Sequence, residues 1–330
     1  MTALSAIVVD HRGGPLLQRC LADLRVALDR LAEPCELIVV DNGGGMEGVP
    51  DGRLVSMPSN AGFAGGAVAG LEQASGEWIA LVNNDAFLAP DCLVHLLAAG
   101  RGSARAGSVA PRIHFDGRRD LVNSAGLEVD VLGIGSDRLA GRSAEDPVVS
   151  TPAEVFGASA CVALYRRAML EAVGGFDASF FAYQEDADVA WRARMAGWSS
   201  LYEPCALAWH LGSATAREAT AFKYRLVGRN RVRMIAKNAS RGQLLRHAPG
   251  MLAFDLAYVG FVAVTDRTLA PLQGRLAGLR EWRRYRRAGA PTRRPVRLPR
   301  GGWRAALRQR AAYRAAAPIK RGAADADPEP

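Results

Sequence analysis

The sequence predicts an α/β fold with a mostly parallel sheet and flanking helices, followed by a basic amphipathic helical extension at the C-terminal end. Short apolar runs alternate with helix-like segments through the first 110 residues, a pattern typical of parallel strands joined by helical crossovers. The balance of charges changes abruptly near residue 266, which separates the extension from the rest. With 49% hydrophobic and 23% charged residues, the chain of 330 residues has the composition of a folded globular protein.

The first half contains four predicted strands and the helices between them. Strands are expected at residues 5–9, 37–40, 53–56 and 78–82, and helices at residues 16–31 and 65–73. Each predicted strand is short and apolar, and glycine or proline residues separate it from its neighbours. Pro90 stands at the start of the next apolar segment and predicts a further helix that runs through residue 99.

The second half is less regular. Residues 111–152 show little periodicity, so we expect a long connection there. Order returns with one strand over residues 155–165, which a glycine interrupts. Helices are expected at residues 166–173 and 186–196, and a last strand at residues 200–210.

The distribution of charge sets the domain boundaries. Residues 1–266 contain 25 basic and 29 acidic side chains, whereas residues 267–321 contain 17 basic side chains and one acidic one. We predict a folded domain over residues 1–240, divided into halves of about 1–110 and 111–240. A basic helical extension over residues 241–321 and a disordered tail over residues 322–330 are expected to follow.

The ends and the cysteines indicate the compartment. The first residues lead directly into an apolar strand without a basic segment or cleavage site, so we expect no secretory signal. The five cysteines are scattered and form no CxxC pair, which favours reduced thiols in a cytoplasmic protein over a disulfide framework or a zinc site.

Residues 251–264 form an apolar stretch of 14 residues that contains Asp255. A membrane-spanning helix needs about 20 apolar residues, so we do not expect this stretch to cross a bilayer. Together with the arginine-rich segment 275–289, it predicts interfacial helices whose arginines meet anionic lipid headgroups. We therefore expect a cytoplasmic protein bound peripherally to the inner face of the cell membrane.

Acidic side chains follow two predicted strands and begin a later helix. Asp41 ends the second strand, Asp85 follows the fourth, and the pair Glu185 and Asp186 precedes a helical segment. Because ligands of open parallel sheets bind beyond the carboxyl ends of the strands, we expect these groups to converge. Asp41 can accept hydrogen bonds from a nucleobase or ribose, Asp85 can hold a divalent cation between two phosphates, and the acidic pair can take a proton from an attacking hydroxyl.

Each of these groups also has a structural interpretation. Asp41 can serve the glycine turn that follows it, and two acids at a helix start are stabilised by the helix dipole. His210, at the end of a predicted strand, can complete a metal shell or be an ordinary buried histidine. The glycines in residues 62–70 can simply allow close helix–sheet packing, and they do not spell the GxGxxG of a dinucleotide fold.

Five blocks in a fixed order are more specific than any one residue. They are ELIVVDNGG, the stretch from NAGF to LVNND, the block GASACVALY to QEDADVAWRARMAGW, the segment YEPCALAWHLG, and RNR. In this order the blocks resemble the inverting family-2 glycosyltransferases with a GT-A (Rossmann-like) fold, in particular their rhamnosyltransferase-like branch. The resemblance covers roughly residues 4–235. It departs from the family in the first-strand loop, VVDHRGG, and in the DxD motif, which is reduced to NND.

The resemblance implies transfer of a sugar from a nucleoside diphosphate donor to a hydroxyl, with inversion and with Mg²⁺ or Mn²⁺ as cofactor. It favours dTDP-rhamnose as donor, over UDP-sugars, and a glycan or a lipid-linked acceptor. No QxxRW motif follows Trp191, which favours addition of one or a few sugars over polymerisation.

The resemblance also assigns residues. It makes Asp186 the general base with Glu185 beside it, and Asp85 and His210 the metal ligands. It assigns to the donor side Asp10, Arg12, Asp41, Asn60, Gly62, Asn84 and Asp85, and to the acceptor side Asp188, Arg229 and Arg231. The parts played by Asp10 and Arg12 stay open, because their loop departs from the family pattern.

Two other function classes are compatible with parts of the sequence. A sugar-phosphate nucleotidyltransferase would need a glycine-rich basic loop after the first strand, of which HRGGP is a weak version. A non-catalytic protein could bind nucleic acid or membrane through arginines interleaved with Trp282, Tyr285 and Trp303. The apolar stretch beside those arginines favours the membrane, so we expect no nucleic-acid partner. The sequence leaves the acceptor and the oligomeric state open.

Overall fold

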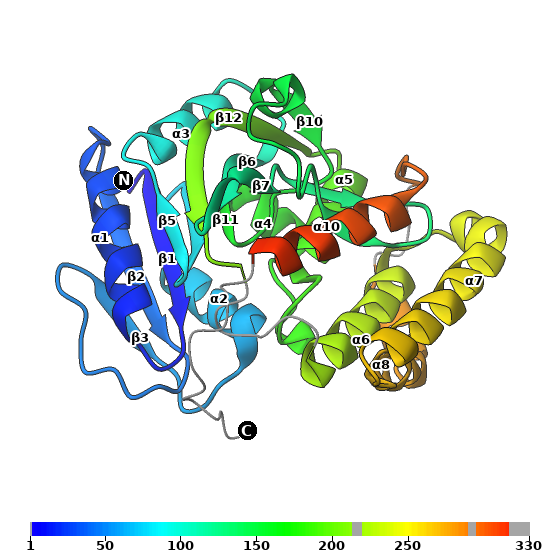
Figure 1. Ribbon diagram of the computed structural model, residues 1–330. Helices are drawn as coiled ribbons and strands as arrows, with labels where there is room; N and C mark the ends of the chain where they lie inside the picture. The colour runs from blue at the N-terminus through cyan, green and yellow to red at the C-terminus, as the bar shows by residue number, and fades with distance from the viewer. Residues whose placement is uncertain (1, 213–219, 290–294, 317–330) are drawn as a thin grey trace.

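The computed structural model describes residues 2–212, 220–289 and 295–316. A ten-stranded sheet lies at its centre, in the order β10-β12-β6-β11-β4-β1-β2-β3, with β5 paired to β12 and β7 paired to β6 (Figure 1). The strands are β1 (Leu4–Asp10), β2 (Cys35–Asp41), β3 (Arg53–Ser56), β4 (Trp78–Asn83), β5 (Ala86–Leu88), β6 (Ala106–Phe115), β7 (Arg118–Ser124), β10 (Ala153–Val155), β11 (Val162–Arg166) and β12 (Ser199–His210). A separate hairpin joins β8 (Leu127–Val129) to β9 (Gly135–Asp137).

Ten helices are described with the sheet. They are α1 (Pro15–Asp29), α2 (Gly62–Gln73), α3 (Cys92–Arg101), α4 (Arg167–Val173), α5 (Glu185–Met195), α6 (Ala221–Asn238), α7 (Arg241–Thr265), α8 (Ala270–Arg280), α9 (Trp282–Ala288) and α10 (Gly302–Ala316). Two short 3-10 turns, Pro147–Ser150 and Ala178–Phe180, complete the described elements.

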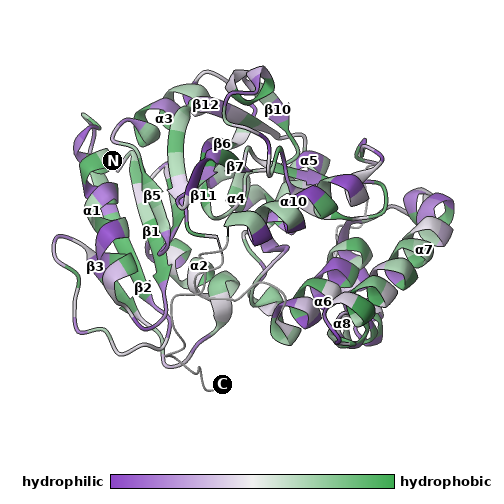
Figure 2. Cartoon of the chain, viewed as in Figure 1, coloured by the Kyte–Doolittle hydropathy of each residue, from purple (hydrophilic) through white to green (hydrophobic). Residues whose placement is uncertain are grey.

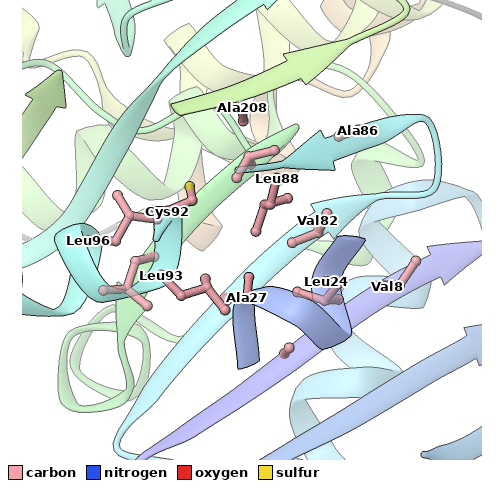
Figure 3. Close-up of a cluster of buried hydrophobic side chains, with 14 of the residues drawn as sticks. Val8, Leu24, Ala27, Val82, Ala86, Leu88, Cys92, Leu93, Leu96 and Ala208 are labelled. Carbon is pink, nitrogen blue, oxygen red and sulfur yellow. The ribbon is translucent and has the colours of Figure 1, made fainter. Parts of the chain in front are cut away.

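The amino-terminal half forms as the sequence predicts. Strands β3, β2, β1 and β4 are parallel neighbours. Successive residues of β1 alternate between two hydrophobic clusters, with Val8 in one and Ile7 in the other. Both faces of the strand are therefore buried, which explains its uninterrupted apolar sequence. Figure 3 shows part of the first cluster, where Leu24 of α1 and Leu93 of α3 pack with the strands.

The prediction that residues 111–152 form an irregular connection is wrong, because they contain several paired strands. Strand β6 continues to Phe115 and forms a hairpin with β7, and the small β8–β9 sheet follows. These strands form because pairing partners supply the backbone hydrogen bonds, although the sequence lacks a strong alternation of apolar and polar residues. The hairpin brings residues 124–137 next to the sheet edge that carries the predicted site.

The predicted strand over residues 155–165 is also wrong, because it is two strands in different parts of the sheet. Strand β10 pairs with β12, whereas β11 lies antiparallel between β4 and β6. The break includes Gly157, where a side chain would come within 2.4 Å of the Cβ of Ala190. The sheet is therefore largely parallel in its first half and mixed in its second.

Helices α6, α7 and α8 lie to one side of the sheet (Figure 1), whereas α10 packs against β7 and β9. The predicted apolar stretch is the second half of α7, a helix of 25 residues that begins with a capping box between Ser240 and Gln243. By length and composition, α7 is the one helix among the described residues that could cross a membrane. The expectation that this segment is too short to span therefore does not hold for the helix as a whole. The predicted tail, residues 322–330, lies outside the described residues.

Candidate active site

The carboxyl ends of β1, β2 and β4 meet at one edge of the sheet. The register pairs Asp10 with Asp41 across β1 and β2, and Val9 with Asn83 across β1 and β4. This edge therefore carries Asp41 and the Asn84–Asp85 turn together, as parallel strands require.

Asp10 and Asp41 shape the loops at this edge. The carboxylate of Asp41 accepts hydrogen bonds from the backbone N–H groups of Gly44 at 2.6 Å and Met46 at 2.7 Å. Asp10 accepts one from the backbone of Gly13 at 2.5 Å and one from the side chain of Asn84 at 2.7 Å. Both carboxyl groups are buried, so each has the loop-closing function that its sequence context allows. Arg12 lies in the loop that Asp10 closes, with φ at 90°.

The Asn60–Gly62 turn joins this edge to the loop that precedes Glu185 and Asp186. Asn60 accepts hydrogen bonds from the amide of Asn42 and from the backbone of Gly62. The N–H of Ala64, in the first turn of α2, donates to the carbonyl oxygen of Phe181 at 2.9 Å. Gly62 has φ at 73°, and a Cβ there would lie 2.3 Å from that carbonyl oxygen. Only glycine allows this approach. Asn42, which the sequence analysis missed, is buried at the centre of the turn.

Asp85 and His210 form a buried pair. Strand β5 pairs with the end of β12, with Ala86 opposite His210, and this register brings the two side chains together. The Nε2 atom of His210 lies 3.2 Å from Oδ1 of Asp85, and Nδ1 lies 3.2 Å from Oδ1 of Asn123. Burial lowers the pKa of His210, but the charges of Cys161 and Asp85 outweigh burial and hold that pKa well above its usual value.

The donor set at this pair is one carboxylate and one imidazole. Among the residues that the structure describes, no group of three His, Cys, Asp or Glu side chains could hold a metal ion. Two protein ligands are enough for an ion whose other ligands are phosphate oxygens and water. The donor set therefore fits a cation shared with a diphosphate, and imidazole with carboxylate suits Mn²⁺ as well as Mg²⁺.

Asp186 lies at the first turn of α5. Its Oδ2 atom accepts a hydrogen bond from the backbone of Ala160 at 3.2 Å, and its Oδ1 atom accepts one from the backbone of Ala187 at 2.7 Å. Burial raises the pKa of Asp186, although these N–H groups oppose the shift. The carboxylate is thus oriented by the backbone and is a stronger base than an exposed aspartate.

Glu185 is more buried than Asp186. Burial, with the charge of Asp186, raises the pKa of Glu185 well above its usual value. Its Oε2 atom lacks a hydrogen-bond partner within the described residues, as do Oε1 of Gln184 and Nδ2 of Asn123. Buried polar atoms are normally satisfied, so these atoms are available for hydrogen bonds to a polar ligand or to water.

The loop before the acidic pair has a strained backbone. Phe181, Tyr183 and Gln184 have φ of 67°, 70° and 70°, a left-handed backbone conformation that residues other than glycine rarely adopt. The amide of Asn230 lies 2.8 Å from the carbonyl oxygens of Phe180, Ala182 and Tyr183 and donates to them. Such strain persists only where the surroundings impose it and often marks functional sites. Asn230 was missed, although the RNR motif contains it.

The residues predicted on the acceptor side lie in a polar network that joins α5, α6 and α7. Asp188 is fully buried and pairs with Arg192 and Lys237. Arg229 donates to the carbonyl oxygen of Phe180 at 2.9 Å. Arg231 pairs with Asp255 at 2.7 Å. In this arrangement Asp188 and Arg229 tie α5 and its preceding loop to α6, whereas Arg231 ties α6 to α7.

Asp137 is a further carboxylate that sequence reasoning missed. It ends β9, in the region predicted to be an unstructured connection. Burial, and to a smaller extent the charge of Asp186, raises the pKa of Asp137 to about 6, while a hydrogen bond with Ser124 opposes the shift. No local pattern distinguishes this residue, because the hairpin that delivers it forms through pairing.

The site thus combines a buried carboxylate–imidazole pair, an oriented carboxylate with a raised pKa, and strand-end loops beside them. The model of the family described as Glycosyl transferase family 2 matches residues 5–174. The chain belongs to this family. The family predicted from the sequence blocks is therefore confirmed, and the protein is a glycosyltransferase.

Two curated relatives extend the comparison for this family 2 enzyme. Both are named N-acetylglucosaminyl-diphospho-decaprenol L-rhamnosyltransferase, and they come from Mycobacterium tuberculosis strains CDC 1551 / Oshkosh and ATCC 25618 / H37Rv. Each is 29% identical over 235 residues, which cover 63% of this chain and 75% of the relative.

Solved structures share the fold. GalNAc-T7 with UDP, GalNAc and Mn²⁺ aligns with a TM-score of 0.58 and 12% identity, over 85% of this chain and 57% of that one. The mannosyltransferase PcManGT from Pyrobaculum calidifontis, in complex with GDP-Man and Mn²⁺, aligns with a TM-score of 0.50 and 16% identity, over 95% and 85%. The predicted GT-A fold is confirmed by these likenesses, which at such identities concern the fold alone.

Proposed function

We propose that this glycosyltransferase moves rhamnose from dTDP-rhamnose to a hydroxyl of a lipid-linked saccharide, with inversion at the anomeric carbon. The order of the sequence blocks and the two rhamnosyltransferase relatives support this donor. The relatives' acceptor is a diphospho-decaprenol carrying N-acetylglucosamine, so a polyprenyl diphosphate sugar is the acceptor class that we favour. One or a few sugars are added in each round.

The observation on which the mechanism rests is the oriented carboxylate of Asp186. Two backbone N–H groups fix its direction, and burial raises its pKa toward the range in which a carboxylate is an effective general base. Asp186 accepts the proton of the acceptor hydroxyl as that oxygen attacks the anomeric carbon. The anomeric bond to the nucleoside diphosphate breaks, and the diphosphate leaves with the electron pair. Burial and the charge of Asp186 raise the pKa of Glu185 well above its usual value, which disfavours a second negative charge beside Asp186.

Asp85 and His210 are the residues that would hold a divalent cation, Mg²⁺ or Mn²⁺. Such an ion, when bound, supplies positive charge that stabilises the leaving diphosphate. Support comes from the 3.2 Å approach of the two side chains and from Mn²⁺ in both structural relatives. His210 must lose its proton to act as a ligand, and Asn123 orients its ring from the other nitrogen.

The loops at the strand ends form the proposed donor site. Asp41 and the loop that it closes would receive the base, and Asn84 with Asp10 would fix the turn that presents Asp85. Asn60 and Gly62 would place the amino end of α2 beside the diphosphate. Arg12 would supply positive charge from the first-strand loop.

The outward face of α7 and α8 is the part of the enzyme that would meet a membrane. On α7, Leu245 is 83% exposed, Leu256 is 66% exposed and Val264 is 81% exposed. At α8, four exposed leucines recur at intervals of three and four residues: Leu269, which caps the helix, and Leu272, Leu276 and Leu279 within it. We call these side chains the α7–α8 face; Figure 2 shows the hydrophobic colour along α7. Exposed apolar surface of this extent is uncommon on soluble monomers and favours a lipid or protein partner.

The opposite face of α7 favours a helix that lies in the plane of the interface. Asp255, in the middle of α7, accepts from Arg231 of α6 at 2.7 Å and from Arg275 of α8 at 2.6 Å. Crossing the bilayer would draw Asp255 into hydrocarbon, at a cost of about 2.5–3.5 kcal/mol for each charged side chain. The exposed arginines of α9 would then lie beside anionic headgroups. This arrangement supports peripheral attachment at the cytoplasmic face of the membrane.

The test is a donor panel with two readouts. Binding of dTDP-rhamnose, UDP-sugars and GDP-mannose is measured with Mn²⁺, Mg²⁺ or EDTA, and nucleotide release is measured with a short-chain polyprenyl diphosphate N-acetylglucosamine. The proposal expects metal-dependent binding and release for dTDP-rhamnose. Tighter binding of another donor would overturn the sugar assignment, and binding unchanged by EDTA or by Asp85→Asn would overturn the metal assignment.

A further inference from the structure

Helix α10 places a side chain on Asp137, a buried carboxyl group on which the charge of the proposed base acts. The carboxamide of Gln309 makes two hydrogen bonds with one residue: Nε2 donates to Oδ2 of Asp137 at 2.6 Å, and Oε1 accepts from the backbone N–H of Asp137 at 3.2 Å. The two residues are 172 positions apart in the sequence. A segment from the far end of the chain therefore occupies a carboxylate oxygen and the backbone N–H of Asp137.

Asp137 faces the reaction side of the molecule. Strand β9 packs against the loop that precedes Asp186, because a Cβ on Gly135, two residues before Asp137, would lie 2.7 Å from Oε1 of Gln184. The charges of Asp186 and His210 accordingly act on the carboxyl group of Asp137. Ser124 orients the same carboxyl group from β7. Tyr313, one turn after Gln309, packs edge-on against Phe115 and lies over the ammonium group of Lys223. Helix α10 thus lies along the acceptor side of the site, against β7 and β9 (Figure 1).

We propose that Asp137 is an acceptor-binding subsite for two neighbouring sugar hydroxyls, and that Gln309 is an internal stand-in that the acceptor displaces. This inference rests on the proposed function. One hydroxyl donates to the carboxylate of Asp137, and the oxygen of the next hydroxyl accepts from its backbone N–H, as Gln309 does now. A sugar held in this way has a further hydroxyl within reach of Asp186.

The attachment of α10 is suited to displacement. Of its described side chains, only Ala305 and Ala312 are buried, whereas Trp303 and Leu307 are each 46% exposed. Its other polar contacts are few: Gly302 donates to Asp130 at the start of the helix, and the guanidinium groups of Arg310 and Arg314 both pair with Asp266. Elements with few buried apolar contacts open at low cost in free energy.

Substitutions at the two ends of the hydrogen bond between Gln309 and Asp137 distinguish this proposal from a purely structural role of the bond. Gln309→Ala removes the stand-in, and Asp137→Asn weakens the subsite by replacing the acceptor carboxylate with an amide. Arg308→Ala, an exposed change on the same helix, is the matched control. The probe is a short-chain polyprenyl diphosphate N-acetylglucosamine, and its dissociation constant is measured by ligand-observed NMR, which needs no turnover. The acceptor KM and the donor affinity are measured in parallel.

We expect effects of opposite sign. Gln309→Ala should tighten probe binding by about three- to tenfold, whereas Asp137→Asn should weaken it at least tenfold; these changes correspond to one hydrogen bond gained or lost. Donor affinity and the Arg308→Ala variant should match wild type. Effects of the same sign in both variants would mean that the pair only holds α10 in place and would overturn the proposal. A probe that binds none of the proteins would also overturn it. Probe binding without sugar transfer would instead contradict the proposed function alone.

Discussion

The contact between Gly62 and Phe181 offers a sharp test of how the donor edge and the catalytic loop are joined. In Gly62→Ala, the new methyl group would lie 2.3 Å from the carbonyl oxygen of Phe181 and 2.5 Å from its ring. Both atoms belong to the strained loop that precedes Asp186. The loop must therefore move away, or α2 must shift, and the hydrogen bond from Ala64 to Phe181 is lost in either case.

The expected cost has two parts. A non-glycine residue at φ of 73° costs about 1–2 kcal/mol in backbone strain. Crowding in a packed region adds about 1–3 kcal/mol. Gly174→Ala is the matched control, because Gly174 has φ of 79° and a Cβ there meets nothing within 4 Å. The control should show the first part alone, so Gly62→Ala should be the less stable variant by about 1–3 kcal/mol.

Activity should separate the two variants further. Misplacement of a catalytic group by about 1 Å can lower a rate by about 100-fold. Urea unfolding would measure stability, and sugar transfer at saturating donor would measure the effect on Asp186. We expect Gly174→Ala to transfer at the wild-type rate and Gly62→Ala to be slowed at least tenfold while still folded. Equal stability and equal rates in both variants would refute the proposed link between α2 and the catalytic loop.

Three other predictions concern the catalytic loop, the acidic pair and the α7–α8 face. Asn230→Ala should cost about 1–3 kcal/mol of stability, because it leaves loop carbonyls unpaired, and should lower the transfer rate more than donor affinity. Urea unfolding and donor titration measure the two effects, and an unchanged transfer rate would contradict the prediction. Glu185→Gln should become more stable relative to wild type as pH rises from about 5 to 7, by up to about 1.4 kcal/mol per pH unit. The reason is that folded wild type retains the Glu185 proton, which its unfolded chain loses, whereas the variant has no such proton. Urea unfolding at both pH values measures the difference in stability, and a difference that does not change with pH would refute the prediction. Leu256→Lys should release the protein from anionic vesicles, whereas Val26→Lys, a change at an exposed apolar position on α1, should not. Sedimentation with vesicles measures both variants, and retained binding of Leu256→Lys would exclude the α7–α8 face as the docking surface.

The sequence predicts the amino-terminal half well because its structure is encoded locally. The buried strand of Val8 and the helix of Leu24 each carry their own apolar pattern, and parallel pairing then places Asp41 and Asp85 at one edge. A motif in the sequence predicts a role for Gly62. The structure shows why glycine is required there: Phe181, which is 119 residues away in the sequence, approaches its backbone closely.

The second half is less predictable because its strands are defined by their partners. Nothing local to Asp137 distinguishes it from a loop aspartate, and its neighbours come from β7, α5 and α10. The same holds for Asn230, which acts on a loop 47 to 50 residues earlier. The length of α7 was missed for a different reason: Arg246 and His247 interrupt the apolar pattern although the helix continues through them.

The most direct test of the account is the effect of Asp186→Asn on sugar transfer, measured with donor affinity on the same protein. The amide keeps the shape of the side chain but is far too weak a base to take the acceptor proton. The account predicts that the transfer rate falls at least about 100-fold, the usual contribution of a general base, while metal-dependent donor binding stays at the wild-type level. A variant that transfers at a near-normal rate, or that loses donor affinity in parallel, would contradict the assignment of Asp186 as the base.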